Sequence, residues 1–133
     1  MIDIVKLSSL YPQVIIHNHK IEYMEWIIED GNVSKQVQTS EDIATIVRNM
    51  MDGKSEFIIL SPSEPVKACN FIQAVLVSTE EIHFEVSLLQ PTGKNRTYSK
   101  VCTSDVAIRI FTLFFTEKMV PDVSNWTFEG EFD

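Results

Sequence analysis

The chain has 133 residues, of which 44% are hydrophobic, so it can bury a core and is expected to form one domain over residues 1–133. Its 4 glycines and 5 prolines are too few for a disordered or fibrous protein. The formal net charge of −8 argues against a nucleic-acid partner, because binding to phosphates needs clustered Lys and Arg side chains.

The start of the chain and its apolar runs predict a cytoplasmic protein. Residues 1–13 lack the basic start and the continuous apolar stretch of a secretory signal. No apolar run approaches the roughly 18 residues that a membrane-spanning helix needs, so we expect no membrane partner. Cys69 and Cys102 are too few for a disulfide scaffold and are expected to be buried, reduced thiols.

The first strong strand signal covers residues 19–30. Met24, Trp26 and Ile28 alternate on one face of this stretch, as in a strand with one buried side. The turn sequence "DGN" follows, which predicts that residues 33–38 return as a partner strand.

Residues 39–53 carry the clearest helix signal. Thr39 or Ser40 can cap the free N–H groups at its start, and Gly53 ends it. Apolar residues recur at the spacing of one buried helical stripe, which consists of Ile43, Ile46, Val47, Met50 and Met51.

The second half of the chain predicts a strand, a hairpin, another strand, a second helix and a tail strand. These elements are expected over residues 56–60, 71–89, 96–102, 103–118 and 123–133. The helix is apolar around more than half of its circumference. Its packed side is predicted to hold Val106, Ile110, Leu113 and Phe114, widened by Phe111 and Phe115.

The order of these elements indicates the fold class. Consecutive strands with short connections favour antiparallel pairing. Two amphipathic helices must each bury an apolar face. We therefore predict an α+β fold with two layers, in which two helices pack on one face of a mostly antiparallel sheet.

His17, Asn18 and His19 share their one-letter codes with the HNH nuclease signature but not its spacing. In HNH nucleases these residues are spread over a ββα unit rather than adjacent. Two imidazoles also need a further ligand to hold a metal, and only Glu22 and His83 suggest one. We predict surface histidines, no bound metal and no cofactor.

The chain shows no motif for nucleophilic catalysis or for binding a nucleotide phosphate. His83 and Glu85 alternate on one face of a predicted strand, and such a pair can perform acid–base chemistry. One open hypothesis is therefore a small enzyme or ligand-binding protein that uses the open sheet face around His83, Glu85 and Tyr98.

Two segments, residues 21–31 and 119–133, are acidic and contain no Lys or Arg. They are either ordinary solvated surface or a binding surface, in which carboxylates steer a basic partner and Trp26, or Trp126 and Phe128, supply apolar contact. The predicted partner-binding residues are Glu22, Glu25, Glu29, Asp30, Asp122, Trp126, Glu129 and Glu131.

Residues 56–130 contain a Phe-x-Gln strand, a second strand, an aromatic helix and a late Trp. The residues at these positions are Phe71, Gln73, Phe84, Glu85, Val106, Phe111, Phe114 and Trp126. With this pattern the segment resembles small bacterial immunity proteins, in particular those associated with deaminase-type polymorphic toxins.

The resemblance implies a non-enzymatic protein that binds and blocks a cognate toxin. Because the chain is acidic, that toxin is expected to present a basic surface. A ligand-binding or enzymatic domain stays open as an alternative, as does a structural subunit of a larger assembly. The oligomeric state is left open.

Overall fold

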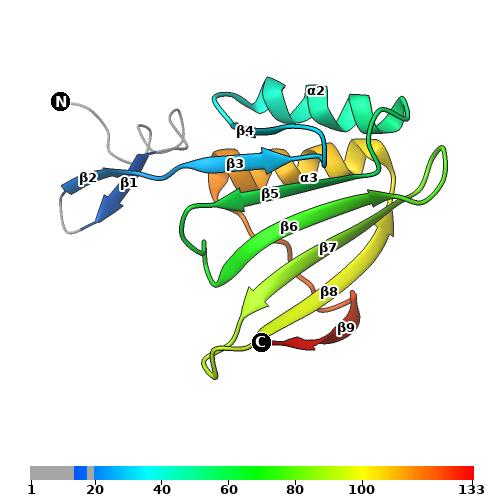
Figure 1. Ribbon diagram of the computed structural model, residues 1–133. Helices are drawn as coiled ribbons and strands as arrows, with labels where there is room; N and C mark the ends of the chain where they lie inside the picture. Colours follow the sequence, from blue (N-terminus) through cyan, green and yellow to red (C-terminus); the bar gives the residue numbers. More distant parts are fainter. Residues whose placement is uncertain (1–13, 18–19) are drawn as a thin grey trace.

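The computed structural model describes residues 14–17 and 20–133, and side chains from residue 24 onward. Seven strands form one antiparallel sheet, and two helices pack on one face of it (Figure 1). The predicted two-layer α+β fold with a mostly antiparallel sheet is therefore confirmed.

The sheet has the spatial order β4-β3-β5-β6-β7-β8-β9, and a separate pair consists of β1 and β2. The strands are β1 (Val14–His17), β2 (Lys20–Tyr23), β3 (Trp26–Glu29), β4 (Ser34–Gln36), β5 (Phe57–Pro62), β6 (Cys69–Leu76), β7 (Ile82–Leu89), β8 (Asn95–Cys102) and β9 (Thr127–Phe132). The helices are α2 (Ser40–Met51) and α3 (Ser104–Glu117). Neither described helix is long and apolar enough to cross a lipid bilayer.

The stretch that predicted one strand at residues 19–30 forms two. β2 pairs with β1, whereas β3 lies in the large sheet between β4 and β5. Between them, the Glu25 N–H donates to the Ser63 hydroxyl at 3.2 Å and the Glu25 carbonyl accepts from the Ser63 N–H at 2.8 Å. The predicted alternation is nevertheless confirmed, because Met24, Trp26 and Ile28 are all buried.

Helix α2 begins and packs as its sequence predicts. The Asp42 carboxylate accepts the backbone N–H groups of Gln38 at 2.8 Å and Thr39 at 3.1 Å, so it stabilises the turn that leads into the helix. The predicted apolar stripe faces the core. Ile43, Ile46, Val47 and Met50 are buried, and Met51 is partly buried against them.

Helix α3 packs on a face slightly rotated from the predicted one. Its fully buried residues are Ala107, Phe111, Phe114 and Phe115, whereas Val106 is 39% exposed. The prediction that Val106 lies on the packed side is therefore wrong. Because the helix is apolar around most of its circumference, periodicity alone left two overlapping stripes to choose from.

The core lies between the helices and one face of the sheet. Trp26 of β3 is fully buried, and its ring meets those of Phe114 and Phe115 edge to face, with centroids 5.0 and 5.6 Å away. The ring of Phe84 on β7 packs against the ring of Phe111 on α3, with their centroids 4.9 Å apart. Aromatic contacts therefore fix α3 against two separate parts of the sheet.

Candidate functional site

One face of the sheet is turned away from both helices, and we call it the open face (Figure 1). The side chains that alternate with the buried ones along β5, β6 and β7 lie on it. Most of them are partly buried by their neighbours rather than fully exposed. Together with the side chains opposite them on β3 and β8, they include Ile27, Glu29, Phe57, Ile59, Phe71, Gln73, Val75, His83, Glu85, Ser87, Thr97, Ser99 and Val101.

One line of these side chains crosses almost the whole sheet, and we call it the cross-strand row. Strand register places each member directly opposite the next, and the Ser99 hydroxyl completes the line by donating to the Glu129 carboxylate of β9. The row spans five strand spacings, about 24 Å. Its members in order are Glu29, Ile59, Gln73, Glu85, Ser99 and Glu129.

The Lys and Arg side chains of the seven strands lie on one face of the sheet. The basic residues of the seven strands are Lys35, Arg96 and Lys100, which lie opposite Ile28, Leu88 and Phe84. Because residues directly opposite one another share a face, these cations lie on the helix side. Among the described strand residues, the open face therefore carries the carboxylates of Glu29, Glu85 and Glu129 and no Lys or Arg.

The predicted catalytic group is only partly assembled. His83 Nε2 lies 3.1 Å from Glu85 Oε1, and both side chains are partly exposed on the open face. Tyr98 does not join them, because it lies opposite Val86 on the helix side, with its ring 5.6 Å from that of Phe128. The prediction of a cluster including Tyr98 is therefore wrong, and Ser99 occupies the position beside Glu85 instead.

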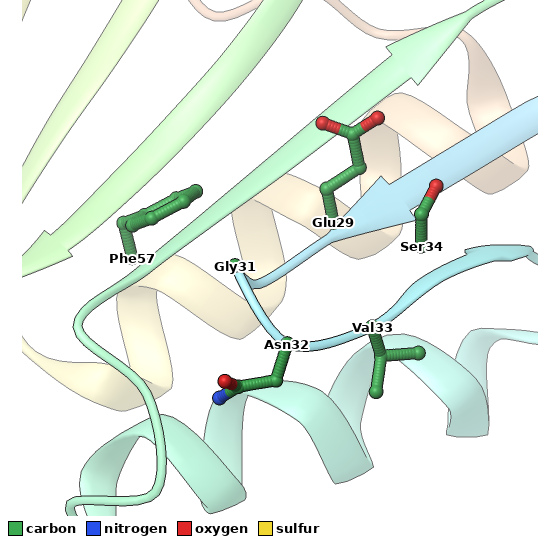
Figure 2. Close-up of a pocket in the computed structure, with 6 residues that line it drawn as sticks. All are labelled: Glu29, Gly31, Asn32, Val33, Ser34 and Phe57. Carbon is green, nitrogen blue, oxygen red and sulfur yellow. The ribbon is translucent and has the colours of Figure 1, made fainter.

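A shallow depression of about 260 Å³, which we call the notch, lies at the β3 end of the cross-strand row. Figure 2 shows the Glu29 carboxylate and the Phe57 ring on the same side of the β3–β4 turn. The turn itself forms the floor between them. The notch is lined by Glu29, Gly31, Asn32, Val33, Ser34 and Phe57.

Two of the predicted partner-binding residues, from distant parts of the chain, lie on the same face of the sheet but far apart. Glu29 and Glu129 lie at opposite ends of the cross-strand row. Glu25 is exposed just before β3. Asp30 shapes the β3–β4 turn, because its Oδ1 accepts the backbone N–H groups of the residues two and three positions later.

The remaining predicted residues serve local contacts. Glu131 lies 3.8 Å from Arg96, on the next strand. Asp122 accepts the Ser124 N–H and hydroxyl, and these hydrogen bonds hold the pKa of its carboxyl below the usual value. Trp126 is partly buried, edge-on to a core ring. The side chain of Glu22 lies outside the described residues.

Trp26 is not available as a surface anchor. Its side chain is 0% exposed, so the prediction that it could contact a partner is wrong. Phe128, by contrast, is 54% exposed on the edge strand β9. Phe132 is equally exposed, so the C-terminal acidic segment presents Phe128 and Phe132 to solvent as its exposed aromatic side chains.

The histidines, acidic residues and cysteines of the described chain do not gather into a metal site. Among the described residues, no three His, Cys, Asp or Glu side chains come together as metal ligands. The side chains of His17 and His19 lie outside the described part of the chain, so the prediction for them stays a prediction. Burial raises the pKa of the Cys69 thiol to about 12, which makes it a poor nucleophile at neutral pH.

Sequence reasoning did not place Phe57, Ile59, Gln73 or Ser99 in a functional site. Alternation within strands contained part of the signal, since Ile59 and Gln73 occupy positions between buried neighbours. Their alignment into one row depends on strand order and register, which alternation does not encode.

Comparison of the chain with known protein families, with curated proteins and with solved structures finds no match.

Proposed function

We propose that this chain is a non-enzymatic immunity protein that binds and neutralises a cognate toxin in the cytoplasm through its open face. The observation that carries the proposal is the cross-strand row. It presents Glu29, Glu85 and Glu129 on a sheet face that lacks Lys and Arg. Such a face complements a basic protein surface.

The open face combines the two ingredients of a protein interface. Phe57, Ile59 and Phe71 are partly buried apolar side chains that can lose their remaining water on contact with a partner. The carboxylates attract a basic surface over longer distances and speed association. A toxin that handles nucleic acid needs a basic surface for its own substrate, so an acidic sheet face suits its inhibition.

The residues that carry the resemblance to immunity proteins include both core residues and open-face residues. Among them, Phe84, Phe111 and Phe114 are fully buried and support the fold. Phe71, Gln73 and Glu85 lie on the open face. Residues that support folding and residues that face a partner are therefore both represented in the resemblance.

The proposal is tested with a triple variant of the cross-strand row, in which Glu29, Glu85 and Glu129 are changed to Gln. The control changes Glu64, Glu80 and Glu81 to Gln, which removes the same charge from exposed loops. The partner is a toxin domain that the wild-type chain binds and neutralises. We expect the row variant to associate at least tenfold more slowly at low salt, to lose salt dependence and to protect cells poorly.

Equal association rates and equal salt dependence for the two triple variants would place the interface elsewhere. Phe71→Ala adds a second readout, because loss of an apolar contact should raise the dissociation rate rather than slow association. A wild-type dissociation rate in this variant would argue against a role for the apolar part of the open face.

A small enzyme or ligand-binding protein is a second candidate, favoured by the 3.1 Å contact between His83 and Glu85. His83→Ala discriminates between the two. If the variant binds the toxin normally but no longer protects cells, acid–base chemistry is required and the non-enzymatic proposal fails. If it binds and protects normally, the enzymatic candidate is rejected.

A further inference from the structure

We infer that the notch at the β3–β4 turn binds the guanidinium group of an arginine side chain from a partner protein. The inference rests on the proposed function for the identity of that partner. Its chemistry depends only on the residues of the notch. It adds a specific recognition site to one end of the cross-strand row.

The walls of the notch are held in place by hydrogen bonds within the turn. Asp30 Oδ1 accepts the N–H groups of Asn32 at 3.0 Å and Val33 at 2.8 Å. The Asn32 amide Nδ2 donates to the carbonyl of Lys54, 3.2 Å away on the loop after α2. A site already fixed before binding loses little conformational entropy when a ligand enters.

Glu29 supplies a carboxylate for the ligand. Its side chain is exposed, and within the described part of the chain no hydrogen bond or ion pair occupies it. No Lys or Arg lines the notch. Lys54 lines the adjoining depression, which shares Gly31, Asn32 and Phe57 with the notch. Among the described residues that line the notch itself, Glu29 carries the single charge, so the notch attracts a cation and repels an anion.

Phe57 supplies an aromatic ring beside that carboxylate. A Cβ atom at Gly31 would lie only 3.2 Å from Phe57 Cε1, so the glycine lets the ring sit directly against the turn. The same glycine adopts a φ of +87°, which the turn requires. The result is a ring and a carboxylate at the same small depression, on the same side of the turn (Figure 2).

This combination selects a guanidinium group over other cations. A guanidinium is planar, so it can stack on an aromatic ring while it donates two parallel hydrogen bonds to a carboxylate. The ammonium of lysine is a compact, strongly hydrated charge that lacks this fork. A volume of about 260 Å³ gives room for the end of an arginine side chain.

The test uses N-acetyl-arginine amide as the probe, titrated into isotopically labelled protein and followed by amide chemical shifts. N-acetyl-citrulline amide is the matched control, because it keeps the shape and loses the charge. We expect saturable shifts at Gly31, Asn32, Ser34 and Phe57 with the arginine probe only. Glu29→Gln should weaken binding at least fivefold, while Glu64→Gln should leave it unchanged.

The inference is overturned if citrulline produces the same shifts, if Glu29→Gln binds as wild type, or if the largest shifts lie outside the notch. Glu29 is exposed, so the variant is expected to fold, which its amide spectrum verifies. Toxin neutralisation without arginine binding would reject this inference and leave the proposed function standing. Arginine binding by a protein that does not bind a toxin would support this inference and reject the proposed function.

Discussion

The indole side chains of Trp26 and Trp126 lie in different environments. Trp26 is fully enclosed, with two phenyl rings edge-on to it at interplanar angles of 88° and 89°. Trp126 is only partly buried and meets Phe84 at a centroid distance of 6.1 Å. Edge-to-face contacts of this kind add stability beyond the area they bury, so both tryptophans contribute to the core.

The aromatic residues of α3 should dominate its contribution to stability. Phe111→Ala and Phe114→Ala each remove a fully buried ring, and each is expected to lower the free energy of unfolding by about 3–5 kcal/mol. Val106→Ala, at a residue 39% exposed on the same helix, should cost much less. Denaturant unfolding of the three variants measures the difference, and three equal losses would show that the packed face is misassigned.

Asp42 should make stability depend on pH. Its hydrogen bonds from the Gln38 and Thr39 N–H groups hold the pKa of its carboxyl below the ordinary value of 3.8. When the pKa of a carboxyl is lower in the folded protein than in the unfolded protein, its ionised form stabilises the fold. This contribution is complete at a pH above the pKa in the unfolded protein, and it is lost as the pH falls through the pKa in the folded protein.

Asp42→Ala is therefore expected to cost about 1 kcal/mol at pH 7, as for other losses of a helix cap. The cost should shrink as pH falls below 3.8. Urea unfolding of the variant and the wild type at a series of pH values measures this. Glu41→Gln is the control, because that carboxylate pairs only with the exposed Arg48. A cost for Asp42→Ala that is constant with pH would contradict the assignment.

At the scale of elements, the β3–β4 and β7–β8 turns provide a matched comparison. Gly31 and Gly93 both adopt a φ of +87°, so alanine is strained by the backbone alone at either position. Their surroundings differ. A Cβ at Gly31 would press on the Phe57 ring, whereas a Cβ at Gly93 has no neighbour within 4 Å.

Gly31→Ala should consequently destabilise the protein more than Gly93→Ala. The backbone term is about 1 kcal/mol in each variant, and the ring contact adds to it only at Gly31. In a Phe57→Ala background the difference between the two glycine variants, measured by denaturant unfolding, should disappear. A difference that persists without the ring would mean that the backbone of the two turns, rather than Phe57, sets it.

For the molecule as a whole, the strand order predicts a hierarchy of local stability. β5, β6 and β7 are paired on both sides and bury alternate side chains against the helices. β4 and β9 form the two edges of the seven-stranded sheet, and β9 is mostly exposed. Segments with few buried contacts open at low free energy.

Native-state hydrogen exchange should therefore be slowest at the paired amides of β5, β6 and β7 and several orders of magnitude faster in β9. The control is exchange under conditions of global unfolding, where all amides should report the same opening. Protection in β9 equal to that in β6 would contradict the strand order, because an outer strand would then be as stable as the centre.

The fold class and most of the helices and strands are predictable from residue order. Burial of one face imposes a period of two on strands and about 3.6 on helices. The alternation of Met24, Trp26 and Ile28 and the apolar stripe on α2 are therefore predictable from residue order alone. The acidic segments are equally evident in the sequence, because net charge is a sum over residues.

The assembly of the site depends on strand order and register, which no local pattern encodes. Alternation says that Glu29 and Glu85 point away from buried neighbours, but register and strand order make them members of one row with Ser99. The same register separates Tyr98 from His83 and Glu85. It also places Lys35, Arg96 and Lys100 on the helix side of the sheet. A pairing shift of one residue would reverse every such assignment, and pairing is settled by long-range contacts among many side chains rather than by any local pattern.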